Sequence, residues 1–239
     1  MKRLSIVLLI SLLVEIVSIT AFSGLRGQGK SPQKTFDETQ FPVVDEYTLK
    51  IQNNIERAKS ESKAKRFRMA IPAVSDSPTM VLAGVRHWPE DFSALPVRES
   101  TAIVIGDVTE AKANLSEDRT AVYSDFKIKP VTVLKDNDKI GEELTATRYG
   151  GKVRFQDGNS LLVFQSGLGM PRVGRRYVFF LKETQDDADL LTAYELKNGK
   201  VLPIDSGTPN FNVYENVNEA DFLKALQNKI ESLSKLTLN

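Results

Sequence analysis

The sequence predicts a mainly β protein: a small closed or partly open β-barrel with an N-terminal helical extension and a C-terminal helix. Between residues 100 and 205, short apolar segments alternate with turn residues, which is typical of barrels and sandwiches. The segment 175–182 is apolar on both faces, so we expect it inside such a structure and not at an edge. A barrel is favoured because the long segment 120–134, interrupted by Pro130, can bend around both sides.

The N-terminus has the pattern of a secretory signal peptide over residues 1–23. The basic pair Lys2-Arg3 precedes an apolar run over residues 4–22, and small residues near its end suit cleavage. The alternative is an uncleaved membrane anchor, although Glu15 within the run costs about 2.5–3.5 kcal/mol on insertion scales. We therefore expect an exported protein that is periplasmic, secreted or held at the cell surface.

Three segments precede the predicted barrel. Residues 24–44 are largely polar and are expected to form a linker. Residues 45–70 are predicted to form a helical extension, because apolar residues recur near helical spacing and charged residues occupy the other positions. Prolines end this helix, and residues 71–99 are expected to connect it to the barrel.

The predicted barrel domain covers residues 100–205, and a C-terminal tail and helix cover residues 206–239. Asp157-Gly158 and Asn198-Gly199 mark two tight hairpins, because these residue types accept the backbone conformation that such turns need. Asn218 is the expected N-cap of the final helix, whose apolar stripe packs on the barrel or, alternatively, docks a partner. Strands are expected at 101–111, 120–134, 143–149, 153–155, 160–165, 175–182, 190–196 and 200–204.

The composition excludes several kinds of chemistry. The chain has no cysteine and one histidine, which excludes zinc fingers, thiol nucleophiles and multi-histidine metal sites. With 32 basic and 31 acidic residues, the net charge of +1 gives no electrostatic footprint for nucleic acid. We expect no cofactor and no metal.

Catalytic motifs are also missing from the sequence. Only His87 could serve a Ser-His-Asp triad, and no Gly-x-Ser-x-Gly nucleophile elbow is present. The glycines in the segment 167–174 precede a strand and not a helix, so they predict a tight turn and not a phosphate site. The acidic turns 136–138 and 186–189 do not continue as calcium-binding loops.

Two basic clusters are the remaining candidates for a contact surface. One lies on the predicted helical extension and contains Lys63, Lys65, Arg66 and Arg68 around Phe67. We favour the other, in which three arginines precede the core strand and two further cations lie near them. Its ligand would be anionic: an acidic lipid, a polyanionic glycan or the carboxylates of a partner protein. The alternative is solvated charge paired with neighbouring acids. The favoured set is Arg172, Arg175, Arg176, Lys152 and Arg154.

Three passages of the chain resemble a family of uncharacterised exported bacterial proteins: residues 102–109, residues 123–135 and residues 150–181. The resemblance implies an OB-like β-barrel and no particular activity. A more remote similarity is to netrin-like domains, the OB barrels that metalloprotease inhibitors use. Those domains carry an N-terminal cysteine and disulfides, so their inhibitory mechanism does not transfer to a chain without cysteine.

The function we expect is an exported, non-enzymatic binding or interaction module. One alternative is a hydrolase-like enzyme that uses His87 or a pair of carboxylates. Another is a membrane-anchored structural protein that keeps residues 4–22 as its anchor.

Overall fold

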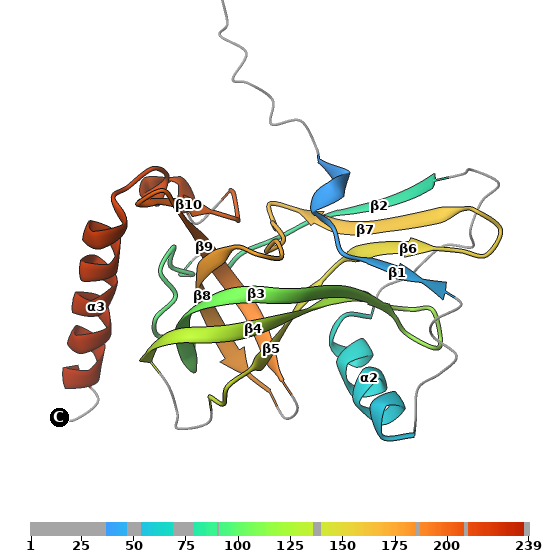
Figure 1. Cartoon of the computed structure of the whole chain (residues 1–239), viewed down its shortest axis with the longest axis horizontal. Helices are drawn as coiled ribbons and strands as arrows, with labels where there is room; N and C mark the ends of the chain where they lie inside the picture. The colour runs from blue at the N-terminus through green and yellow to red at the C-terminus, as the bar shows by residue number, and fades with distance from the viewer. Residues whose placement is uncertain are drawn as a thin grey trace, which may run out of the picture. The chain divides into compact units, whose positions relative to one another are not determined.

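The computed structural model divides the chain into two units, Met1–Asp37 and Glu38–Asn239, and the second contains the fold (Figure 1). The predicted signal segment 1–23 lies outside the described residues. Within the described part of the chain, no helix has the length and apolarity needed to cross a membrane. The structure describes residues 37–46, 54–68, 79–89, 91–135, 140–184, 187–207 and 210–236.

Five strands of the second unit form a ring. β3 pairs antiparallel with β4 and β8, β4 with β5, and β8 with β9. The ring closes where β5 runs parallel to β9, over only two residue pairs, Ala146–Ala188 and Thr147–Asp189. The predicted OB-like, partly open barrel is therefore confirmed. Its strands are β3 (Ala102–Leu115), β4 (Val122–Lys135), β5 (Leu144–Tyr149), β8 (Arg176–Glu183) and β9 (Ala188–Lys197). β10 (Lys200–Pro203) pairs antiparallel with β9.

A second sheet of four strands packs beside the C-terminal end of β3 and the N-terminal end of β4 (Figure 1). Its central hairpin, β6 with β7, turns at Asp157-Gly158 as the sequence predicts. The two outer strands, β1 and β2, pair in parallel with this hairpin and lie where no strand was predicted. For β2, Pro72 and Pro78 predicted a connecting segment, so the strand that follows them was not recognised. The sheet order is β1 (Val43–Asp45), β6 (Gly151–Arg154), β7 (Ser160–Ser166) and β2 (Thr79–Val85).

β8 is buried on both faces, as its sequence predicts. Tyr177, Phe179 and Leu181 belong to the apolar cluster inside the barrel. Val178 and Phe180 belong to a second cluster on the outer side of the barrel wall. The two faces of one strand therefore contribute to separate cores, which explains why the buried residues 177–181 carry no charge.

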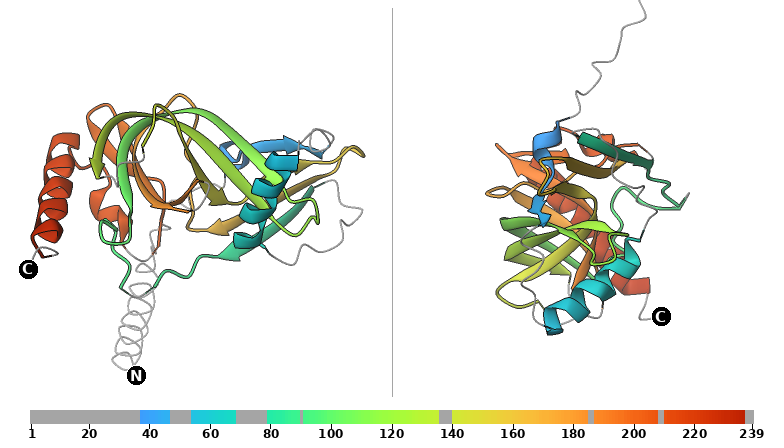
Figure 2. Two further views of the ribbon diagram at one scale, coloured as in Figure 1. Left: turned by 90° about the horizontal axis from the view of Figure 1, so that it is seen from below. Right: turned by 90° about the vertical axis from the view of Figure 1, so that its right-hand side faces the viewer.

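The C-terminal helix α3 (Glu219–Leu236) covers that outer cluster (Figure 2). The side-chain oxygen of Asn218 accepts a hydrogen bond from the backbone amide of Ala220 at 3.0 Å, so the predicted N-cap is present. Phe222 and Leu226 are fully buried and pack with Tyr194 and neighbouring aromatic rings. Packing on the barrel, and not an unoccupied apolar face, is what the structure shows for this helix.

Helix α2 (Asn54–Arg66) lies at the opposite end of the β3–β4 pair from α3 (Figures 1 and 2). It is shorter than the predicted helical extension, because residues 43–45 form β1 and residues 47–53 lie outside the described part. Among the side chains that the structure describes, Ala64 of this helix and Phe67, which follows it, join an apolar cluster with Ala121 and Tyr123. Ion pairs from the charged side chains of the helix add to this contact.

Gly169 provides a direct test of the packing behind the barrel wall. A methyl group on Gly169 would lie 2.1 Å from the carbonyl oxygen of Ile204, closer than any real contact. We expect Gly169→Ala to lower the free energy of unfolding by about 1–3 kcal/mol in urea denaturation. The control is Gly141→Ala, whose new methyl would lie 3.9 Å from the nearest atom. Equal stability of the two variants would contradict this packing.

Candidate functional site: an arginine-lined cavity

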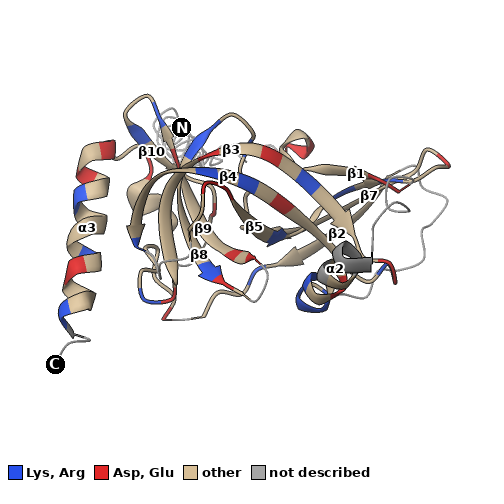
Figure 3. Ribbon diagram, turned by 60° about the horizontal axis from the view of Figure 1, so that its bottom comes forward, with Lys and Arg blue, Asp and Glu red and all other residues tan. Residues whose placement is uncertain are grey.

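The arginines of the favoured basic set are paired with acids on different strands. Arg175 donates from Nη1 to Glu195 on β9 at 2.8 and 3.0 Å. Arg176 makes a two-pronged contact with Asp107 on β3 at 2.8 and 2.9 Å. Positive and negative positions both occur along β3 and β4, as Figure 3 shows. Arg175 and Arg176 therefore pair with acids on the two strands that flank β8, which are β9 and β3.

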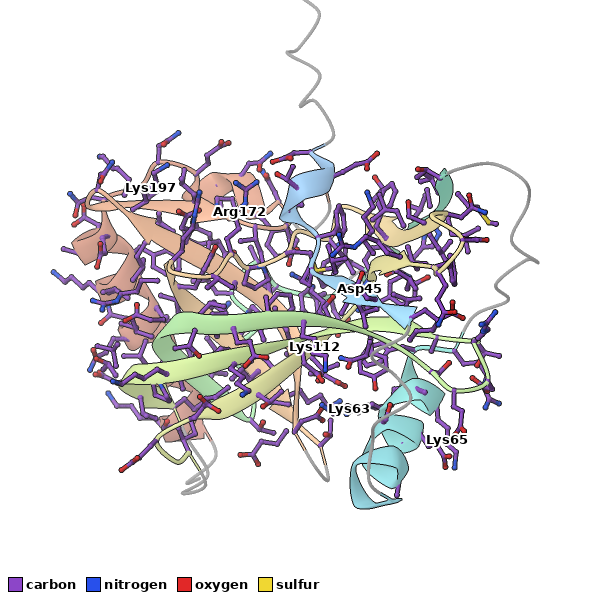
Figure 4. All side chains as sticks on the ribbon, turned by 45° about the vertical axis from the view of Figure 1, so that its right-hand side comes forward. Asp45, Lys63, Lys65, Lys112, Arg172 and Lys197 are labelled. Carbon is purple, nitrogen blue, oxygen red and sulfur yellow. The ribbon has the colours of Figure 1, made fainter. Side chains whose placement is uncertain are left out.

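The other members of that set lie on separate elements. Lys152 and Arg154 of β6 reach Glu38 at 3.3 Å and Asp45 at 2.9 Å. Arg172, labelled in Figure 4, lies in the connection between β7 and β8, and its backbone amide donates to the Tyr177 hydroxyl at 2.9 Å. Ion pairs with neighbouring acids thus involve Lys152, Arg154, Arg175 and Arg176, and ligand binding by this set stays a prediction.

The other basic cluster turns part of its charge inward. Lys63 points from α2 towards the barrel strands, whereas Lys65 points away (Figure 4). Lys63 Nζ lies 2.9 Å from both Asp125 and Asp187. Arg66 reaches Asp187 at 2.8 Å, and the side chain of that aspartate is only 1% exposed. Ion pairs with buried acids therefore hold α2 against the barrel.

Asp187 is the centre of this network. It accepts hydrogen bonds from Thr147 at 2.6 Å and from Thr184. Burial raises the pKa of Asp187, but the hydrogen bonds from Thr147, Thr184 and Lys63 outweigh it and lower the pKa to about 2. The carboxylate is therefore ionised throughout the physiological range.

A second ion pair, between Arg148 and Asp205, is buried almost completely. Its nitrogen–oxygen distance is 2.7 Å, and the two side chains are 2% and 0% exposed. Arg148 also donates to the carbonyls of Gly169 at 2.7 Å and Leu191 at 3.4 Å. Asp205 accepts from the backbone amide of Gly169 at 2.9 Å. This pair therefore joins β5 to β9 and to the segments that precede β8 and follow β10.

A cavity of about 350 Å³ lies between these two networks. It is bounded by the end of α2, the residues that follow β2, the end of β5 and the start of β9. Four arginines line it, from three separate parts of the chain: Arg66, Arg68, Arg86 and Arg148. The apolar part of the wall comes from Phe67, Trp88, Tyr149, Leu168, Leu190 and Leu191.

Four polar side-chain atoms of residues in this wall are buried without a hydrogen-bond partner among the described residues. They are Arg148 Nε, Trp88 Nε1, Gln165 Oε1 and Asp189 Oδ1. Buried polar atoms are normally paired, and leaving one unpaired costs about 1–3 kcal/mol. Asp189 Oδ1 lies 3.2 Å from Arg66 Nη1 in an ion pair, whereas the two N–H donors have no such contact and are suited to a ligand that carries acceptor oxygens.

Arg86 has no carboxylate partner among the described residues and stacks on Trp88. Its guanidinium carbon lies 4.8 Å from the centre of the indole ring. Partial burial and the charge of Arg148 lower the pKa of Arg86, while Asp205 raises it. A guanidinium remains protonated at neutral pH despite such a shift. Arg86 is therefore a positive charge that lies against the Trp88 ring in the wall of the cavity.

A second depression, of about 400 Å³, also borders Arg86 and Trp88 and contains His87. It is also lined by Ser166 and Ser206. His87 is exposed, and within the described ranges no hydrogen bond joins it to a hydroxyl or a carboxylate. A triad needs both contacts, so no triad is assembled there. The part of the chain that the structure describes also contains no group of three acidic or histidine side chains able to hold a metal ion.

No model of a known protein family and no curated protein matches this chain. The resemblance to exported bacterial proteins, and the more remote one to netrin-like domains, stays a prediction. The choice of site therefore depends on geometry and chemistry alone, and the arginine-lined cavity is the best-supported candidate.

Sequence reasoning found part of this cavity and missed the rest. The basic cluster around Phe67 supplies Arg66 and Arg68. Arg86 and Trp88 were noticed only as neighbours of His87. Arg148 carried a usable signal: it shares the inward side of β5 with Leu144 and Ala146, where an apolar residue is expected. A charged residue at such a position indicates a buried ion pair.

The network around Asp187 predicts a specific loss of stability in acid. Its folded-state pKa lies below the usual value of about 3.9, so its stabilisation is complete above that value and is lost as the pH falls towards 2. We expect this group to contribute on the order of 2 kcal/mol to the change in unfolding free energy between about pH 6 and pH 2.5. Urea denaturation at both pH values measures it.

The matched variants are Asp187→Asn and Asp91→Asn, since Asp91 is 78% exposed. The first should reduce the pH dependence, and the second should leave it unchanged. An unchanged pH dependence in Asp187→Asn would show that the carboxylate does not hold α2.

Proposed function

We propose that this protein is an exported, non-enzymatic binding module whose ligand is an anion bound in the arginine-lined cavity. The observation on which this proposal depends is the combination of Arg86, which has no carboxylate partner among the described residues, with two buried, unpaired N–H donors, Arg148 Nε and Trp88 Nε1. Such donors favour negatively charged oxygen over water. The signal-like segment 1–23 supports the exported location.

The elements around the cavity support binding by a preformed site. Arg148 is fixed by its bonds to Asp205 and Gly169, and Arg86 is oriented by the Trp88 ring. A ligand would therefore meet donors whose rotamers are already set, so little side-chain entropy is lost on binding. The cavity volume of about 350 Å³ falls in the range of small-molecule sites.

A hydrolase is the second candidate, because His87 shares its depression with Ser166 and Ser206. The lack of a hydrogen-bonded base among the described residues makes it the weaker one. The membrane-anchored alternative concerns residues 4–22, outside the described part, and N-terminal sequencing of exported material decides it. A start at Gly24 is the result expected for a cleaved signal.

Trp88 is the only tryptophan of the chain, so intrinsic fluorescence reports directly on the cavity. We expect a saturable change in its emission on titration with at least one of acetate, phenylacetate, sulfate or inorganic phosphate at low salt. Arg86→Gln should weaken that binding by at least about 10-fold, since a charge-assisted hydrogen bond is lost.

The control is Arg98→Gln, whose side chain is 71% exposed and does not line the cavity. It should bind like the natural protein. The proposal fails if no anion produces a saturable change, or if the two variants respond alike.

A further inference from the structure

We infer that the ligand of the arginine-lined cavity is a small organic monocarboxylate, a single carboxylate on a compact apolar body. This inference rests on the proposed function, since it names the ligand class of the same cavity. It depends on two observations: the number of positive charges in the wall that lack a partner, and the chemistry of the rest of the wall.

One arginine of the wall lacks a direct carboxylate partner. Three of the four arginines are paired with carboxylates, and Arg86 has no such partner within the described ranges. The wall therefore offers one guanidinium to which a single carboxylate of a ligand can bind. The existing pairs are Arg66–Asp187, Arg66–Asp189, Arg68–Asp118 and Arg148–Asp205, at nitrogen–oxygen distances of 2.8, 3.2, 3.2 and 2.7 Å.

A carboxylate matches the single arginine without a carboxylate partner better than a phosphate does. A phosphate monoester carries a charge of about −1.5 to −2 at neutral pH, so part of its charge would stay uncompensated near Asp205 and Asp189. A carboxylate carries one charge, and its two oxygens match the paired N–H groups of a guanidinium. The Arg86 guanidinium lies over the Trp88 ring and makes no ion pair within the described ranges, so its N–H groups can form such a contact.

The remaining wall favours an apolar body on the ligand. Leu168, Leu190 and Leu191 line the cavity together with the rings of Phe67 and Trp88. Moving apolar surface from water into such an environment is favourable. Acetate and inorganic anions have little apolar surface to bury there. The volume of about 350 Å³ lies at the lower end of ligand sites, which limits the body to a compact one.

Isothermal titration calorimetry with three probes tests this inference: phenylacetate, acetate and inorganic phosphate. We expect phenylacetate to bind at least about 10-fold more tightly than either of the others. Arg86→Gln should weaken phenylacetate binding by about 10- to 100-fold. Arg98→Gln should leave it unchanged, and unaltered urea denaturation of Arg86→Gln establishes that the variant is folded.

Each other outcome has a distinct meaning. Tighter, Arg86-dependent binding of phosphate would overturn the monocarboxylate and leave the proposed function standing. Equal affinities for acetate and phenylacetate would overturn the apolar body. No binding of any probe at millimolar concentration would overturn both this inference and the proposed function.

Discussion

The buried ion pair between Arg148 and Asp205 is the interaction on which both the barrel and the cavity depend. The parallel ladder between β5 and β9 covers only two residue pairs, and Arg148 follows it directly. Its guanidinium donates a hydrogen bond to the carbonyl of Leu191 on β9. This side-chain contact therefore joins β5 to β9 just beyond the last backbone pair. An apolar pair could fill the same volume, and such replacements are often tolerated elsewhere. Only the arginine, however, also places an unpaired N–H group in the wall of the cavity.

Charge also fixes the second wall of the cavity. Among the described side chains of helix α2, Ala64 packs in an apolar cluster, and Lys63 pairs with both Asp125 and Asp187. Because Arg66 pairs with Asp187 and also lines the cavity, the network that holds the helix shapes the candidate site as well. A change that neutralises Asp187 is therefore expected to alter the cavity as well as the stability of the fold. This coupling relates the acid sensitivity of the protein to its ability to bind.

Local patterns predicted the fold better than they predicted the site. The two faces of β8, the hairpin at Asn198-Gly199 and the cap at Asn218 each depend on a few neighbouring residues, and all three are confirmed. β1 and β2 were missed because parallel pairing joins segments far apart in the sequence, which leaves no local turn signal. The cavity was missed for the same reason, since its four arginines come from three separate parts of the chain. Only the fold brings the first basic cluster and Arg148 to the same place.

The free energy of unfolding of Asp205→Asn is the most direct test of the claim that one buried ion pair closes the barrel and forms the cavity. This variant leaves Arg148 buried without a counter-charge, which should cost about 3–5 kcal/mol in urea denaturation. The matched control is Asp107→Asn, which breaks the exposed pair with Arg176 and should cost no more than about 1 kcal/mol. A loss for Asp205→Asn as small as that of the control would contradict the account.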